Sequence, residues 1–177
     1  LTAINIVREK EIGTIEQINV TPIKKYQFLI GKLFPFWVLA LFELAAGLLI
    51  GKVLFDTPML GSLWLLFAVA GVYLLTVLAL GLLMSTITQT QQQAMFISYF
   101  FLIIFVLMSG VFTSVESMPK LAQWLNRINP VYYFMKVIRM ILLKDSGFSE
   151  IKYEFFILLG FGITMLSLAV WKYKKVA

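Results

Sequence analysis

The chain has 177 residues, of which 60% are hydrophobic and only 14% are charged, and its mean hydropathy is +0.91. Soluble domains are about 45–50% apolar and about 25% charged, so this composition is typical of a membrane protein. The absence of Cys and His excludes thiolate and imidazole metal sites, Ser-His-Asp triads and cysteine nucleophiles, and we expect no metal site. The net charge of +6 comes from basic residues beside apolar stretches, which is typical of headgroup anchors rather than of nucleic-acid binding.

Residues 1–7 are mostly apolar and lead directly into a charged segment. We interpret them as the end of a preceding membrane helix, and the chain as the C-terminal portion of a longer protein. The charged segment runs from Arg8 to Pro22, whereas the sequence from 57 to 115 contains no Asp, Glu, Lys or Arg. A polar segment beside membrane spans must face water, and we expect it to contact a partner protein.

Local signals divide this charged segment. Gly13 is expected to end the helix that precedes it. Thr14 and Gln17 form a Thr-x-x-Gln capping box, which predicts a short helix from about residue 15 to residue 19. Residues 8–32 are therefore predicted to form a loop with one short transverse helix between two membrane helices.

Four later stretches are long and apolar enough to cross a bilayer, which requires about 20 helical residues. Helices are expected because lipid offers no partner to an unsatisfied backbone N–H or C=O group. The chain is therefore predicted to be an all-α membrane protein that forms one partial transmembrane domain. The predicted spans are residues 33–51, 63–84, 94–112 and 155–171, and a tail follows at 172–177.

Residues 113–150 carry a different pattern, typical of two short amphipathic helices. Ser117 is placed to cap the first helix, with Pro119 in its first turn. Asn129-Pro130 is expected to end this helix and to begin the second. Apolar residues recur at helical spacing in both, which favours an interfacial or re-entrant hairpin over a folded domain. An ordinary surface hairpin is the alternative.

Two groups of motifs extend over nearly the whole chain. The first is Arg8-Glu-Lys-Glu-x-Gly-Thr-x-Glu-x-x-x-Val-Thr-Pro22, with Gly31-Lys32 at the start of the next span. The second precedes the last span and consists of Ser109-Gly110, Met118-Pro119, Asn129-Pro130-x-x-Tyr133 and Arg139. In this order and spacing, the motifs resemble those of the membrane permeases of ABC-2 type exporters, with their coupling loop after the second span and their outer-side hairpin before the sixth.

The resemblance implies that the chain holds the end of the second span and spans three to six. It implies a dimer with a second permease, same or related, and a cytoplasmic ABC ATPase subunit under each, which would bind ATP and Mg. The substrate class would be a drug, a lipid, a polysaccharide or a peptide, exported across the cell (inner) membrane. The coupling loop and the C-terminal tail would be cytoplasmic, an orientation that the density of Lys172, Lys174 and Lys175 also favours.

The chain itself is not expected to hydrolyse ATP or to hold a cofactor. A phosphate-binding loop needs Gly-x-x-x-x-Gly-Lys-Ser/Thr, so that backbone N–H groups surround the phosphates. Gly31-Lys32 is followed by Leu33, and Gly51-Lys52 is followed by Val53, so neither fits.

The charged segment supplies the candidate residues for binding the ATPase subunit. Ile15 and Ile18 are placed to fill a groove of the partner, and the glutamates to pair with its basic rim. The alternative is a solvated interfacial loop. The candidate set is Glu9, Glu11, Gly13, Thr14, Ile15, Glu16, Ile18 and Pro22.

Within the membrane, Glu43 is the clearest candidate, because a charged side chain near the middle of a span costs about 3 kcal/mol. One expectation is that Glu43 lies in the transport path or at a permease–permease interface. The alternative is a protonated side chain that is hydrogen-bonded to a neighbouring helix. Gly47-x-x-x-Gly51 on the same span permits close helix packing, with a chance glycine pair as the alternative.

The hairpin supplies a further candidate set: Pro119, Asn129, Pro130, Tyr133 and Arg139. Arg139 and the nearby Lys136 are placed to attract anionic headgroups or substrate, or to serve only as interfacial anchors.

Two other classes of membrane protein remain open. A secondary transporter would require internal repeats and paired intramembrane charges, whereas the chain shows no repeat and Glu43 is its only mid-span charge. A membrane assembly subunit without a transport role would require neither. A soluble ATPase encoded nearby would separate these classes.

Overall fold

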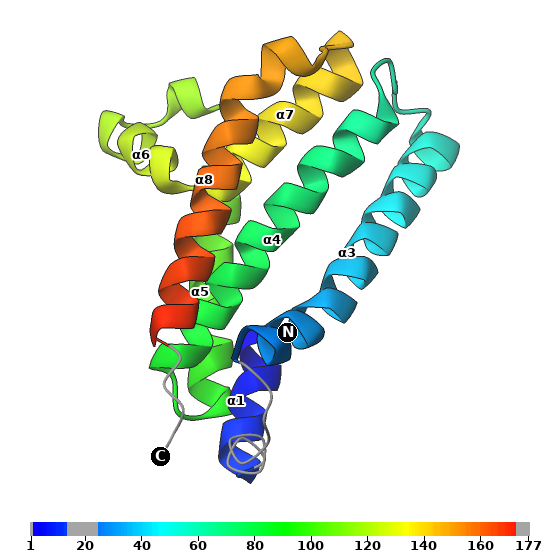
Figure 1. Cartoon of the computed structure of the whole chain (residues 1–177). Helices are drawn as coiled ribbons and strands as arrows, with labels where there is room; N and C mark the ends of the chain where they lie inside the picture. Colours follow the sequence, from blue (N-terminus) through cyan, green and yellow to red (C-terminus); the bar gives the residue numbers. More distant parts are fainter. Residues whose placement is uncertain (1, 14–24, 173–177) are drawn as a thin grey trace.

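The computed structural model describes residues 2–13 and 25–172, and within these ranges all regular structure is helical (Figure 1). This confirms the predicted helical class. Four of the helices are long and apolar enough to cross a membrane, as predicted. The helices are α1 (Thr2–Ile12), α3 (Lys25–Phe55), α4 (Leu63–Ile87), α5 (Gln91–Met108), α6 (Lys120–Leu125), α7 (Pro130–Lys144) and α8 (Phe148–Lys172), with single 3₁₀ turns at Val115–Ser117 and Asn126–Ile128.

The third predicted span, 94–112, extends past the end of its helix. Helix α5 begins earlier, at Gln91, because the Thr90 hydroxyl caps it by accepting a bond from the backbone N–H of Gln93. The helix also ends four residues earlier than predicted, at Met108. Gly110 has a φ of +85°, a left-handed conformation that glycine adopts without strain and that stops the helix.

The start of α6 also differs from the expectation. Ser117 does not cap this helix, because it ends the preceding 3₁₀ turn, where its hydroxyl donates to the carbonyl oxygen of Ser114 at 2.7 Å. Pro119 precedes Lys120, the first residue of α6. The second helix begins as predicted, since the Asn129 side chain caps α7 and Pro130 occupies its first turn.

Helix α4 is the centre of the bundle, and its most extensive contact is with α8. The core between α4, α7 and α8 includes Leu66, Val69, Val137 and Leu158, all fully buried. Close approach of α4 and α8 depends on Gly162, because a β-carbon there would lie 3.0 Å from the Thr76 hydroxyl oxygen.

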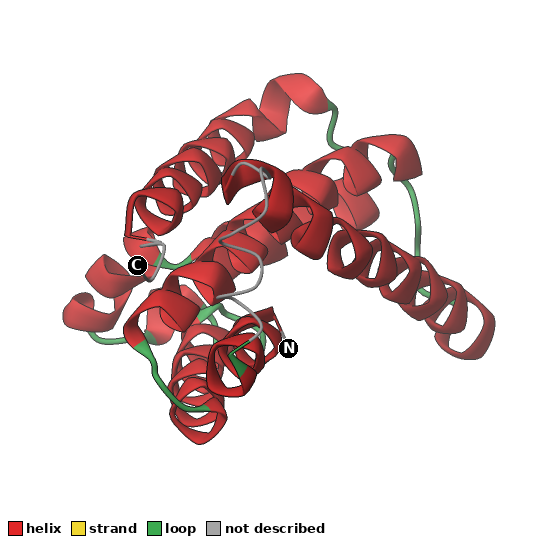
Figure 2. Ribbon diagram, turned by 60° about the horizontal axis from the view of Figure 1, so that its bottom comes forward, coloured by secondary structure: helices red, strands yellow, loops and turns green. Residues whose placement is uncertain are grey.

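Helix α3 lies at the edge of the bundle (Figures 1 and 2). It is anchored to α4 by Trp37, whose indole N–H donates to the carbonyl oxygen of Gly71 at 3.0 Å. A β-carbon at Gly71 would lie 3.2 Å from the Trp37 ring, so the glycine permits this contact. Most of the outer face of α3 carries exposed apolar side chains such as Phe42 and Val53.

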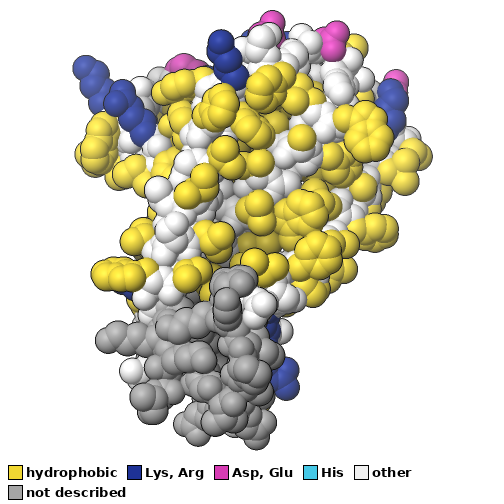
Figure 3. Space-filling view, viewed as in Figure 1, with side chains coloured by type: hydrophobic (Ala, Val, Ile, Leu, Met, Phe, Trp, Pro, Cys, Tyr) yellow, Lys and Arg dark blue, Asp and Glu magenta, His cyan; other side chains and the backbone are white. Residues whose placement is uncertain are grey.

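Polarity follows the long axis of the molecule. On the face shown in Figure 3, hydrophobic side chains cover the middle, and the charged side chains gather toward the two ends. Such a broad exposed apolar band is a liability in water and is stable in lipid. We call the end that holds α1 and the α4–α5 turn the α1 end, and the opposite end, which holds α7 and the loop from 56 to 62, the α7 end.

Candidate functional site

The charged residues of α1 contact the turn that joins α4 to α5. The Lys10 ammonium group donates to the backbone carbonyl oxygen of Ser85, in the last turn of α4. Carbonyl groups in the last turn of a helix carry partial negative charge, so a cation is favourable there. Partial burial lowers the pKa of Lys10.

The next residue, Glu11, contacts the other side of the same turn. Its carboxylate accepts a hydrogen bond from the backbone N–H of Gln91 at 2.9 Å and a second from the Gln91 side-chain amide. Gln91 is the first residue of α5, where the unpaired N–H groups of a helix favour an anion. These hydrogen bonds lower the pKa of Glu11.

Glu9 completes the set by pairing with Lys32 of α3, and both side chains are largely buried. Three consecutive residues of α1 therefore contact three different long helices. We call Glu9, Lys10 and Glu11, with their partners Lys32, Ser85 and Gln91, the α1 clamp. From the sequence, Glu9 and Glu11 were predicted to pair with a partner's basic rim, whereas in the structure both carboxylates have partners inside the chain.

Gly13 ends α1, as predicted. Its φ is +78°, and its N–H donates to the carbonyl oxygen of Lys10 at 3.2 Å. The remaining residues of the predicted partner-binding set lie outside the described residues: Thr14, Ile15, Glu16, Ile18 and Pro22.

Glu43 lies near the middle of the apolar part of α3, Leu29–Phe55, and its side chain is exposed on the outer face of the bundle. Among the described residues, no helix provides a hydrogen-bonding partner for its carboxylate. The neighbouring Phe42 is 71% exposed, so this face of α3 points away from the other described helices. The contact with a neighbouring helix that was one alternative for Glu43 is therefore not made within the described part of the chain.

The two glycines on this helix have different surroundings. A β-carbon at Gly47 would meet no atom within 4 Å, so no described helix packs there. Gly51 instead lies against Thr57, whose backbone N–H donates to the Gly51 carbonyl oxygen at 3.2 Å. Within the described chain, the expected packing through both glycines does not occur, and Gly51 serves the turn after α3.

At the α7 end, two buried asparagines hold the hairpin. The Asn129 side-chain amide donates to the carbonyl oxygen of Phe105 at 2.8 Å and to the side-chain oxygen of Asn126 at 3.2 Å. Its own oxygen accepts from the backbone N–H of Val131 at 3.0 Å and so caps α7. Asn126 was missed from the sequence because an Asn in a short amphipathic helix usually faces water.

Of the other hairpin candidates, Pro130 and Tyr133 are buried, and the Tyr133 hydroxyl donates to the carbonyl oxygen of Arg127 at 3.1 Å. Arg139 donates to the carbonyl oxygen of Gly110 at 2.6 Å and so ties α7 to the end of α5. Pro119 is exposed just before α6, and among the described residues no contact between it and the other four candidates was found.

Glu154 of α8 is a second residue that the sequence analysis missed. It is 4% exposed and pairs with Lys136 of α7, with 2.7 Å between the carboxylate oxygen and the ammonium nitrogen. The hydrogen bond to Glu154 raises the pKa of Lys136. The spacing of Glu154 from the apolar stretch that follows it gives no sign that it faces inward.

The residues that the structure describes contain no group of three or more His, Cys, Asp or Glu side chains that could hold a metal ion. The geometry is that of a membrane bundle with a polar clamp at one end and a hydrogen-bonded hairpin at the other. It provides contacts that hold helices together rather than groups that perform chemistry.

Residues 1–171 match the family described as "ABC-2 family transporter protein". The chain belongs to this family. It is similar to the "Probable multidrug ABC transporter permease YbhR" of Escherichia coli, with 36% identity over 147 residues, which is 83% of this chain and 40% of that protein. It is also similar to YbhS, described in the same words, at 30% identity over 82% of this chain and 39% of that protein.

A third relative, the "Inner membrane transport permease YhhJ" of Escherichia coli, is 26% identical over 99% of this chain and 47% of its own length. The chain therefore spans less than half the length of these curated relatives. No solved structure matches it. Membership in this permease family, whose members lack an ATPase domain, makes the chain a multi-pass membrane component without an ATPase site of its own.

Proposed function

We propose that this chain is part of the permease subunit of an ABC exporter, and that a separate cytoplasmic ATPase subunit drives it through the segment that follows α1. The α1 clamp carries the proposal, because Glu9, Lys10 and Glu11 connect the start of this segment to α3, α4 and α5. A force applied after Gly13 would act on three of the long helices at once.

The clamp suits transmission of movement because two of its contacts are made to helix ends. Lys10 binds the end of α4 and Glu11 the start of α5, so the α4–α5 turn is held from both sides. Packed helices move as rigid units, and a shift of one end is carried along the axis. ATP binding in the partner would thereby move α4 and α5.

We divide the partner-binding candidates accordingly. Glu9 and Glu11 hold the segment against the bundle, and the surface offered to the ATPase subunit consists of Gly13, Thr14, Ile15, Glu16, Ile18 and Pro22. In this proposal the α1 end and the tail at 172–177 lie on the cytoplasmic side of the inner membrane. The ATPase subunit supplies ATP and Mg binding.

The outer face of α3 supports a second permease as a further partner. Glu43 is exposed there near the middle of a span, where contact with lipid alone costs about 3 kcal/mol. Covering this face with protein removes that cost, and Gly47 on the same helix leaves open space for a close approach. The second permease is either the same chain or a related one.

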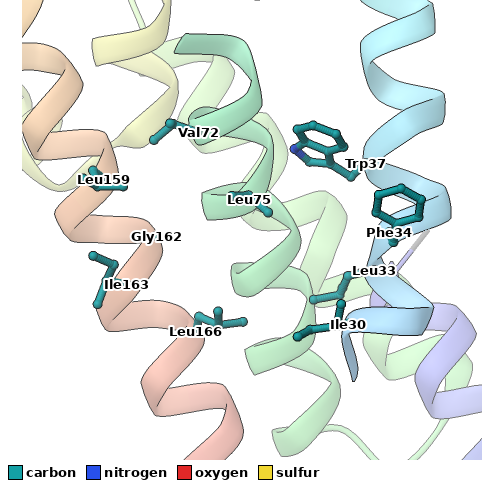
Figure 4. Close-up of a pocket in the computed structure, with 10 residues that line it drawn as sticks. All are labelled: Ile30, Leu33, Phe34, Trp37, Val72, Leu75, Leu159, Gly162, Ile163 and Leu166. Carbon is teal, nitrogen blue, oxygen red and sulfur yellow. The ribbon is translucent and has the colours of Figure 1, made fainter. Parts of the chain in front are cut away.

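The substrate class is best matched by an apolar drug or a lipid. A cavity of about 370 Å³ opens between α3, α4 and α8, and Figure 4 shows side chains of these helices around it. It offers almost no polar group, which disfavours a polysaccharide. Two relatives are described as probable multidrug permeases. The lining residues are Ile30, Leu33, Phe34, Trp37, Val72, Leu75, Leu159, Gly162, Ile163 and Leu166.

Co-purification of the full-length permease with candidate ATPases, followed by ATPase and drug-efflux assays in lipid discs, tests the proposal. We expect Gly13→Pro and Glu16→Lys to lower transport without affecting membrane insertion, because proline cannot adopt the φ of +78° at Gly13. Glu150→Lys is the matched control, since it makes the same charge change at the α7 end. Unchanged ATPase stimulation in both test variants contradicts the coupling role. Efflux that persists without ATP supports the secondary transporter instead.

A further inference from the structure

A cavity of about 500 Å³ at the α7 end differs from the apolar cavity between α3, α4 and α8. It lies beside α7. Its lining includes Ser109, just after α5, and Lys144, the last residue of α7. Three basic side chains line it together with one carboxylate, three hydroxyl groups and several apolar groups. The lining residues are Ser109, Ser114, Val115, Glu116, Tyr132, Lys136, Arg139, Met140, Leu143 and Lys144.

Arg139, one of the three cations of this cavity, is held in position by the backbone after α5. One N–H group of Arg139 donates to the carbonyl oxygen of Gly110 at 2.6 Å. A β-carbon at Gly110 would lie 3.9 Å from the other terminal nitrogen of Arg139 and 3.0 Å from Val115, so the glycine leaves room for this packing. Because a guanidinium group has five N–H donors in a fixed plane, the anchored Arg139 retains donors for a ligand.

The other charges of the cavity differ in how far they are neutralised. Lys136 pairs with the buried Glu154, which balances its charge. Lys136 therefore adds little net positive charge to the cavity. Among the described residues, no carboxylate pairs with Lys144 or Arg139, and Glu116 is the one acidic side chain in the lining. The cavity therefore keeps a net positive charge that an anion would balance.

The apolar part of the lining narrows the class of anion. Val115, Met140 and Leu143 lie in the same cavity as the cations, and Tyr132 adds an aromatic ring. The opposite face of α7 is buried in the core through Phe134, Val137 and Ile141. A ligand that satisfies both kinds of lining carries an anionic group and an apolar body in one molecule.

We propose that this cavity binds the phosphate group of an anionic phospholipid, with Arg139 and Lys144 as its principal contacts. Phospholipids surround a membrane protein, and a phosphate accepts the forked N–H donors of arginine. The acyl chains of the lipid would lie along the apolar side chains of α7. A bound lipid would fix α7 against the end of α5, a regulatory contact distinct from the proposed coupling at the α1 end.

Native mass spectrometry of the full-length permease in detergent, titrated with phosphatidylglycerol or with phosphatidylcholine of the same acyl chains, tests this site. We expect preferential binding of phosphatidylglycerol and about a fivefold loss of affinity in each of Arg139→Gln and Lys144→Gln. Arg139→Lys should lose less affinity than Arg139→Gln, because it keeps the positive charge but not the forked donors that contact the phosphate. The control variant Lys120→Gln/Lys152→Gln removes two exposed basic residues of the same end that do not line the cavity.

Every outcome decides the proposal. Loss of phosphatidylglycerol binding in the cavity variants alone supports it. Equal losses in the cavity and control variants indicate diffuse attraction and overturn it. Binding of inorganic phosphate without binding of phosphatidylglycerol would show a site for a free anion, which overturns the lipid as its ligand. Because coupling to the ATPase is measured separately at the α1 end, failure here leaves the proposed export function untouched.

Discussion

The two ends of the molecule hold their helices together by different means. At the α1 end, charged side chains bind the ends of neighbouring helices, and the α1 clamp contacts α3, α4 and α5. At the α7 end, neutral amides of Asn126 and Asn129 hold the hairpin from within, and the cations line a cavity.

This difference bears on how each end responds to force or to a ligand. The contact of Glu11 with the start of α5 is exposed, so water can replace either partner and the contact re-forms easily after a shift. Buried amide hydrogen bonds are costly to leave unmade, so the hairpin is expected to keep one arrangement. The α1 end is thus suited to movement, and the α7 end to holding a fixed shape.

The largest effect is expected from Asn129→Ala. This change removes the cap of α7 and leaves the carbonyl oxygen of Phe105 without its partner, at a combined cost of about 3 kcal/mol. Thermal unfolding of the detergent-purified permease should show a lower midpoint. Gln92→Ala, at an exposed position of α5, is the control and should leave the midpoint unchanged. A stable Asn129→Ala variant would mean that the hairpin is not held from within.

Gly61→Ala is expected to destabilise the same end by about 2 kcal/mol. The added β-carbon would overlap the carbonyl oxygen of Ile141, so the backbone of the loop must shift away from α7. That shift breaks the hydrogen bond from the Leu60 N–H to the Leu142 carbonyl oxygen, now 3.2 Å long. Gly147→Ala is the matched control, because a β-carbon there meets nothing within 4 Å. Equal stability of the two variants in chemical denaturation would contradict this account.

Lys136→Ala should also destabilise the α7 end by about 2 kcal/mol, since it leaves the buried Glu154 without its ion pair. The value lies below that of a fully buried pair because the Lys136 side chain is 47% exposed. A double-mutant cycle with Glu154→Gln measures the coupling between the two residues. If the two single effects simply add, the contact contributes nothing.

At the α1 end, Lys10→Met is expected to cost only about 1 kcal/mol of stability, the usual value of a cation at a helix C-terminus. The amount of substrate transported per ATP hydrolysed should also fall, and by more than the small decrease in the folded fraction of the protein would cause. Arg8→Met, which changes an exposed basic residue of the same helix, is the control. If Lys10→Met reduces transport and stability in proportion, the clamp is structural only.

Much of the fold could be predicted from the sequence. Apolar length gave the four spans, and turn chemistry gave Gly13 and Asn129-Pro130 as helix boundaries. These features depend on residues close in the sequence or on the bilayer, so they can be predicted without knowledge of the tertiary structure. The third span was placed wrongly because its apolar composition continues past Met108, where the helix ends.

The contacts between distant segments could not be predicted in this way. Glu11 and Gln91 are 80 positions apart, and neither position has a pattern that points to the other. Glu9 and Glu11 had the composition of a docking surface, and only the packing of α1 against the α4–α5 turn shows that their carboxylates bind inside the chain. Glu154 was missed for the same reason, because its inward position is set by α7.

The smallest expected effect is a pH dependence at the α1 end. The hydrogen bonds from Gln91 lower the pKa of Glu11 in the folded state, so its contribution is complete above the ordinary pKa of a glutamate. The contribution is lost as the pH falls through the lower pKa of the folded state, where the protonated carboxyl no longer accepts both bonds. Hydrogen exchange of the Gln91 backbone N–H, corrected for its intrinsic pH dependence, should therefore become faster in acid. Glu11→Gln should show no such change, because its side chain does not titrate. If the exchange rate depends on pH in the same way in the wild-type protein and in Glu11→Gln, the Glu11–Gln91 contact does not hold the α4–α5 turn. Lys10 would then be the contact that holds this turn, through the end of α4.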